Sequence, residues 1–182
     1  GRPIARRMSE ILGVMYYDRD IVEEVSKQLQ LPAPTISDVE ERAPGSYFSM
    51  RFPLGNMTSD LQNKVFRAQQ DIITELADRE SCIIVGRCAD YVLREKKNLM
   101  RVYIYTSYEN KYDNCVNNLS MTPREAKKMI RDVDQARIAY HMRYAGYMPD
   151  ENKDIQIDSA FLGVEGTAWY LSQAAKHRFG VE

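Results

Sequence analysis

The sequence predicts an α/β protein in which helices flank a parallel β-sheet. Short apolar runs, typical of buried strands, alternate along the chain with longer segments of helical periodicity. The most apolar run, Cys82-Ile83-Ile84-Val85, is typical of a strand that is covered on both faces, as the strands of parallel sheets are. Four strands are expected, at residues 14–17, 82–86, 100–106 and 155–159.

Helices are predicted where apolar residues recur every three or four positions. The longest are expected over residues 59–79 and 123–144. The second of these begins with Thr122-Pro123-Arg124-Glu125, which combines an N-cap, a proline at the first helical position and the glutamate of a capping box. Thr106 and Glu109 have the same capping-box spacing and predict the start of another helix.

Composition excludes several classes of protein. A chain of 182 residues with a net charge of −1 has the length of one domain, expected here over 1–182, and lacks the basic excess of nucleic-acid binders. It contains no apolar run of membrane-spanning length and no signal-peptide core. Its three cysteines have no paired spacing, which favours reduced thiols, a cytoplasmic location and no structural metal site.

The segment 31–58 has a different character from the rest of the chain. Its apolar residues show little periodicity, and turn-forming residues interrupt it throughout. A structureless loop of this length is unusual inside a compact domain, so we expect a small mobile lobe or lid instead. The residues that interrupt it are Pro32, Pro34, Pro44, Gly45, Pro53 and Gly55.

Two short motifs carry the chemistry. Gly86 and Arg87 follow the most apolar strand, and Asp90 lies three residues further on. The carboxyl edge of an open α/β sheet is where ligands bind, so Arg87 is either part of a site or an ordinary surface arginine. Gly1 and Arg2 stand at the start of a helix, which is the arrangement of the second half of a phosphate-binding loop. We expect that the strand that would precede this helix is missing from the sequence.

The chain resembles the cytidylate kinase-like family of P-loop nucleoside-monophosphate kinases, from Gly1 to about Leu171. The resemblance implies a parallel sheet of order 2-3-1-4-5, with the first strand and most of the P-loop absent from this sequence. It also implies transfer of the ATP γ-phosphoryl group, with Mg²⁺, to a nucleoside monophosphate such as CMP. The motifs that carry the resemblance are Gly1-Arg2, Tyr16-Tyr17-Asp18, Gly86-Arg87-Cys88-Ala89-Asp90, Asp134 with Arg137 and Tyr140, and Ile157-Asp158-Ser159.

The same resemblance implies which residues form the site. Residues 31–58 would form the monophosphate-binding lobe, and residues 119–152 a lid-like helical segment. Arginine suits the roles because its planar fork binds two phosphate oxygens at once. The implied catalytic residues are Arg2, Arg87 and Arg137; the ATP-binding residues are Gly1, Arg2, Lys111 and Arg131; and the acceptor-binding residues are Asp18, Arg87, Asp90 and Arg137.

The donor side departs most from the family pattern. Where relatives carry two basic residues for ATP, this chain has Lys111 and then Asn114. Three functions therefore stay open: a nucleoside-monophosphate kinase, a non-catalytic nucleotide-binding module, or a P-loop kinase of another small molecule. A homo-oligomer is possible. Tyr140 and Tyr144, one helical turn apart, either stack on a base or pack on the core.

Overall fold

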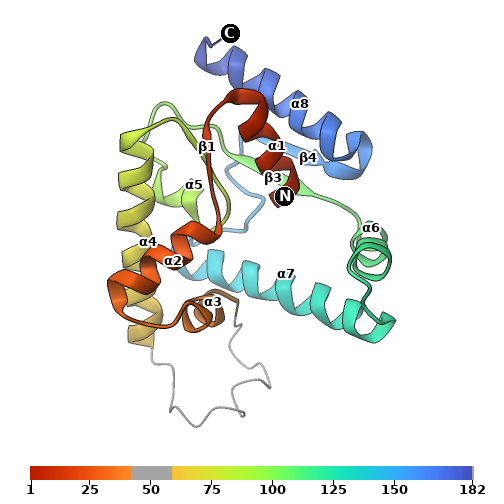
Figure 1. The fold of residues 1–182 in the computed structure, drawn as a ribbon, viewed down its shortest axis with the longest axis horizontal. Coiled ribbons are helices and arrows are strands. Elements are labelled where there is room, and N and C mark those ends of the chain that lie inside the picture. Colours follow the sequence, from red (N-terminus) through yellow and green to blue (C-terminus); the bar gives the residue numbers. More distant parts are fainter. Residues whose placement is uncertain (42–58, 182) are drawn as a thin grey trace.

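The fold is that of a mostly helical α/β protein with short parallel strands (Figure 1). The computed structural model describes residues 1–41 and 59–181. The elements are α1 (Arg2–Leu12), β1 (Met15–Tyr17), α2 (Arg19–Leu29), α3 (Ala33–Glu41), α4 (Ser59–Arg79), β2 (Cys82–Ile84), α5 (Ala89–Val92), β3 (Val102–Tyr105), α6 (Tyr108–Asp113), the π-helical turn η2 (Asn114–Asn118), α7 (Pro123–Ala145), β4 (Ile155–Asp158) and α8 (Ser159–Phe179).

The strands form two parallel pairs. β1 pairs with β2, with Met15 opposite Cys82, and β3 pairs with β4, with Val102 opposite Ile155. All four strands lie where the apolar runs predict them, although each is one to three residues shorter than predicted. The order of the whole sheet, 2-3-1-4-5, stays a prediction.

Strand β2 lies between two separate clusters of apolar side chains. Ile83 packs against the cluster that holds Ile4 and Met8 of α1 and Leu171 of α8. Ile84 packs against the larger cluster, which is built mainly from α2 and α4 and includes the fully buried Ile73. Successive side chains of a strand point to opposite faces, so helices cover both faces of β2 as its apolar sequence predicts.

The local signals at the helix ends are largely confirmed. Helix α4 has the predicted bounds, and α7 begins with the predicted capping box, in which Thr122 and Glu125 bond each other's backbone N–H. The start of α6 was predicted one residue too early. Ser107, and not Thr106, is its N-cap, because the Ser107 hydroxyl accepts the hydrogen bond from the Asn110 N–H.

The segment predicted to be a mobile lobe contains helix α3. Ile36 of this helix is fully buried in the larger cluster, and α3 contacts both α2 and α7. Residues 42–58 lie outside the described residues, so the lobe itself stays a prediction. Within 1–41 and 59–181, no helix has the length and apolarity needed to cross a membrane.

Candidate functional site

The pairing of β1 with β2 brings two predicted site residues to one edge of the sheet. The strands run in the same direction, and the Val85 N–H donates to the Tyr17 carbonyl at 3.0 Å just past the last registered pair. Asp18 therefore emerges beside Gly86 and Arg87. Carboxyl edges of parallel strands are where α/β proteins place their ligands.

Asp18 is the centre of a charged cluster. Its side chain is 5% exposed, and it pairs with two arginines. Arg2 approaches Oδ2 through Nε at 2.6 Å, and Arg87 donates to Oδ1 from Nη1. The Tyr16 hydroxyl donates to Oδ2 at 3.3 Å. One carboxylate thus holds two guanidinium groups, which leaves a local excess of positive charge for an anion.

The two arginines differ in their access to solvent. The Arg87 side chain is 9% exposed and also donates to the Val85 carbonyl at 3.1 Å, so it is fixed by its own strand as well as by Asp18. The Arg2 side chain is 51% exposed. Arg2 lies in the first turn of α1, which follows the N-cap Gly1 and contains Pro3, a residue without an N–H group. The positive end of the helix dipole at this terminus favours an anion.

The backbone that presents Arg87 is unusual. Gly86, Arg87 and Cys88 have φ values of 78°, 55° and 53°, so three consecutive residues are left-handed. For residues with a side chain this conformation is unfavourable, and it persists where the surrounding structure enforces it. We call residues 86–88 the arginine turn. Cys88 is buried, and burial followed by the charge of Asp90 raises the pKa of its thiol to about 12, which favours the neutral thiol over the nucleophilic thiolate.

Arg137 approaches the same edge from α7. Burial, then the positive charges of Arg137 and Arg2, lower the pKa of the Gly1 amino group. Arg137 is therefore near enough to Gly1 to act on it electrostatically. This brings a third predicted arginine to the region of Arg2, while the predicted cleft shared by Arg137 and Arg87 stays a prediction.

Lys111 and Arg131, the two predicted donor-side cations outside the N-terminus, have acidic neighbours. Lys111 of α6 donates to Asp134 of α7 at 2.6 Å, which ties these helices together. Arg131 pairs with the adjacent Asp132 at 3.1 Å, and its side chain is 63% exposed. Their contacts with ATP stay predictions.

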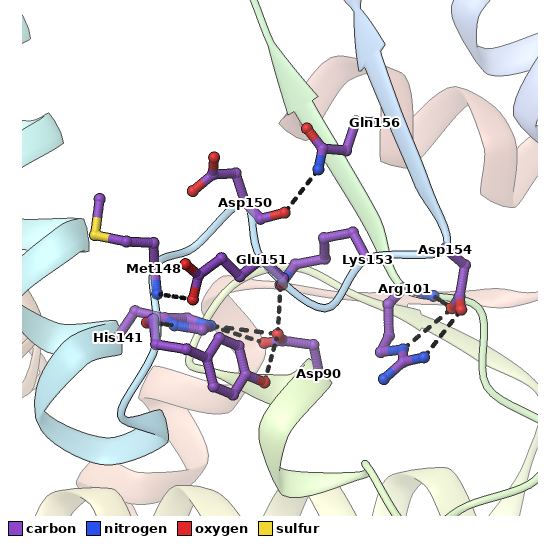
Figure 2. A network of polar contacts seen from close by, with 10 residues as sticks. Asp90, Arg101, His141, Met148, Asp150, Glu151, Lys153, Asp154 and Gln156 are labelled. Carbon is purple, nitrogen blue, oxygen red and sulfur yellow. Dashed lines mark hydrogen bonds and ion pairs between the residues drawn. The ribbon is translucent and has the colours of Figure 1, made fainter.

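Asp90 lies in a polar network that joins α5 to α7 and to the loop that follows α7 (Figure 2). Lys153 donates to Asp90 Oδ2 at 2.7 Å, His141 Nε2 lies 3.3 Å from both carboxylate oxygens, and the Tyr147 hydroxyl donates to Oδ2 at 3.3 Å. Burial opposes the charge on Asp90, but the hydrogen bonds from His141 and Lys153 outweigh it and hold the Asp90 pKa well below its usual range.

Each ring nitrogen of His141 faces a hydrogen-bond acceptor from another residue. Nδ1 lies 2.9 Å from the Tyr147 carbonyl oxygen, and Nε2 faces Asp90. Only the protonated imidazolium donates from both nitrogens. Burial lowers the His141 pKa, but the hydrogen bonds to Asp90 and to the Tyr147 carbonyl raise it above its ordinary value on balance.

The aromatic residues of α7 pack against α4. Tyr144 stacks on Phe66 with ring centroids 3.8 Å apart and planes 10° apart, and Tyr140 meets Phe66 edge-on at 6.1 Å. The Tyr140 hydroxyl donates to the fully buried Gln69. Of the two alternatives left open by the sequence, the structure shows packing between helices.

The polar network around Asp90 is the part of this region that the sequence did not predict. His141, Tyr147 and Lys153 were not candidates, because no short motif links them to Asp90 and they follow it by more than 50 residues. In the described parts of the chain, no group of three or more histidine, cysteine or acidic side chains is placed to hold a metal ion.

Comparisons with known proteins agree on the fold. The chain aligns over 99% of its length with 92% of a solved but uncharacterised protein from Eubacterium ventriosum, at 20% sequence identity and a TM-score of 0.67. At this identity, the likeness concerns the fold alone. No curated protein matches the sequence. The family model of the cytidylate kinase-like family matches residues 1–160, which is most of the chain. The protein therefore belongs to the cytidylate kinase-like family.

Proposed function

We propose that this protein is a nucleotide kinase that transfers the ATP γ-phosphoryl group to a nucleoside monophosphate such as CMP. The observation that supports this most is the pairing of Arg2 and Arg87 with the buried Asp18 at the carboxyl edge of β1 and β2. Phosphoryl transfer needs positioning and compensation of charge more than it needs a protein nucleophile. Fixed arginines at one edge meet that need.

The two sides of the reaction would use different elements. Arg87, Asp18 and Arg137 would bind the acceptor, with Arg87 directed at its phosphate. Arg2 and the first N–H groups of α1 would bind the donor phosphates, because that helix end has a positive dipole and no side-chain cap. When bound, Mg-ATP supplies the phosphoryl group. Mg²⁺ commonly keeps phosphate and water ligands, so a cage of protein carboxylates is not required.

The strand pairs support the finer arrangement of the sheet. β2 is paired with β1 on one edge and β3 with β4 on one edge. The proposed order 2-3-1-4-5 would have one further strand between β2 and β3. The cluster around Ile83, Val102 and Ile4, which already joins β2, β3 and α1, is where such a strand would pack.

Calorimetry and a coupled assay of ADP release test the function. We expect CMP or another nucleoside monophosphate to bind and to stimulate ADP release from Mg-ATP. Arg87→Met should abolish the response, and Arg94→Met, which alters an arginine that pairs with its neighbour Glu95 and lies over the Tyr91 ring, should not. ADP release with a non-nucleotide acceptor alone would redirect the proposal to another small-molecule kinase, and failure of every monophosphate to bind would refute it.

A non-catalytic nucleotide-binding module is the second candidate. The observation that favours it is the ion pair of Lys111 with Asp134. Lys111 is the first of the two residues expected to contact ATP, and its charge is already paired within the protein. Binding of a monophosphate without binding of Mg-ATP, and without ADP release, would support this candidate over the kinase.

A cytoplasmic location belongs to the same proposal. Cys82, Cys88 and Cys115 are free thiols, as expected in a reducing compartment. Association of two copies stays a prediction, and sedimentation of the purified chain would test it.

A further inference from the structure

Lys153 is a buried residue whose charge is paired with that of Asp90. Its side chain is 5% exposed, and lysine is rarely buried unless its charge is paired. The Nζ atom donates to Asp90 Oδ2 and to the Glu151 carbonyl, both at 2.7 Å, and it lies 5.5 Å from the centre of the Tyr147 ring. The loop after α7 therefore places the buried Lys153 ammonium group against the Asp90 carboxylate, as Figure 2 shows.

Asp90 is joined rigidly to the arginine turn. It belongs to α5, whose first residues are bonded back to the turn: the Ala89 N–H donates to the Gly86 carbonyl, and the Tyr91 N–H donates to the Cys88 carbonyl, both at 3.0 Å. With so little backbone freedom between them, a displacement of Asp90 moves the turn at 86–88 as well.

The carboxylate of Asp90 is already engaged by the protein. It accepts from Lys153, from His141 and from the Tyr147 hydroxyl, and a carboxylate has about four acceptor positions. The Asp90 side chain is only 17% exposed. These contacts favour an indirect role for Asp90 over the direct acceptor contact expected from the sequence.

We propose that Asp90, Lys153 and His141 are positioning residues, which hold the arginine turn against α7 and so keep Arg87 in place for the acceptor phosphate. The role of Arg87 rests on the proposed function, but the positioning itself does not. His141 belongs to α7 and Lys153 to the loop that follows it, so the network ties the lid segment to the turn.

The Nε–H signal of Arg87 in ¹H–¹⁵N NMR spectra is a direct readout of position. It can be assigned by its loss in Arg87→Lys. We expect this signal to shift in Lys153→Met, in Asp90→Asn and in the double variant Asp90→Asn/Lys153→Met. The double variant removes both buried charges together, which protects the fold better than removing one.

Asp154→Asn is the matched control. Asp154 is adjacent to Lys153 and pairs with Arg101 at 2.9 Å, and that pair joins the residues that immediately precede β3 and β4. Within the described parts of the chain, the Arg101 and Asp154 side chains make no hydrogen bond to residues 86–88. The control should leave the Arg87 signal in place, although it too removes an ion pair from the same loop.

Nucleotide binding gives the second readout. Lys153→Met, Asp90→Asn and the double variant should each weaken CMP binding by about tenfold to a hundredfold, as expected when a phosphate-binding group is displaced. A folded double variant with the parental Arg87 signal and CMP affinity would overturn the proposal. Weaker binding with an unmoved Arg87 signal would overturn it too, because Asp90 would then contact the ligand itself.

The test separates this proposal from the function on which it draws. If the parent chain binds no nucleoside monophosphate, while the Arg87 signal still shifts in Lys153→Met and not in Asp154→Asn, the positioning network stands and the proposed kinase function fails.

Discussion

Replacing Arg87 by methionine should separate the stability of the site from its function. Met keeps much of the length of the side chain but removes the charge that faces Asp18. In the substituted protein Asp18, whose side chain is 5% exposed, retains only Arg2 as an ionic partner. The consequence is a partly uncompensated buried carboxylate.

The magnitude follows from the burial of the two arginines. Breaking a buried ion pair by removing one partner costs about 3–5 kcal/mol. The remaining pair with Arg2 is half-exposed and offsets only about 1 kcal/mol of this. We therefore expect Arg87→Met to lower the free energy of unfolding by about 2–4 kcal/mol, which for a chain of this length lowers Tm by roughly 5–15 °C.

The double variant Arg87→Met/Asp18→Asn completes the experiment. Because no buried charge is left unpaired, its stability in urea denaturation should exceed that of Arg87→Met. Its CMP affinity, measured by calorimetry, should stay as low as that of the single variant. Equal stability of Arg87→Met and the parent would refute the buried pair, and recovery of CMP binding in the double variant would show that Arg87 acts on the fold alone.

Four further predictions concern stability. Cys88→Val should be about 1–2 kcal/mol less stable in urea than Cys88→Gly, despite its larger apolar side chain, because Cys88 has a φ of 53°; the reverse order would contradict the strain at this residue. Thr122→Ala should cost about 1 kcal/mol, since it removes the hydroxyl that accepts from the Glu125 N–H while the Glu125 carboxylate can still accept from the backbone N–H of residue 122, and an unchanged Tm would argue against a contribution from this cap. The raised pKa of His141 means that the folded state binds its proton more tightly, so this contribution to stability is complete below about pH 6.5 and is lost as pH rises through the folded-state pKa, a loss that His141→Gln should remove from unfolding curves measured across pH. The lowered pKa of Asp90 acts in the opposite direction: its contribution is present above about pH 4 and is lost under more acidic conditions, and a stability in acid that Asp90→Asn does not alter would contradict it.

The helices and their ends were largely encoded in local sequence. The capping box of Thr122 and Glu125 spans four consecutive residues, so its hydrogen bonds need no partner from elsewhere in the chain. The same holds for the apolar periodicity that set the bounds of α4. The cap of α6 was predicted at Thr106 and lies at Ser107, because the position of the cap depends on where β3 ends.

The candidate site was predictable in part. Arg87 was a candidate because it directly follows the most apolar strand, whereas Asp18 was a candidate only through the resemblance to the family. The parallel pairing of β1 with β2 is what brings the two residues together. The burial of Arg87, and the left-handed turn that presents it, were not predictable from its neighbours.

Only the tertiary structure decided which charged residues, far apart in the sequence, form a buried ion pair. Asp90 and Lys153 are separated by 63 positions. From sequence alone, a lysine in a polar loop is expected to be solvated, whereas in the folded protein the Lys153 side chain is buried. The same closure gives His141 two acceptors and gives Ile36, in a segment predicted to be a mobile lobe, a fully buried position. Local sequence determines hydrogen bonds between near neighbours, whereas the partner of a buried charge depends on the whole path of the chain that returns to it.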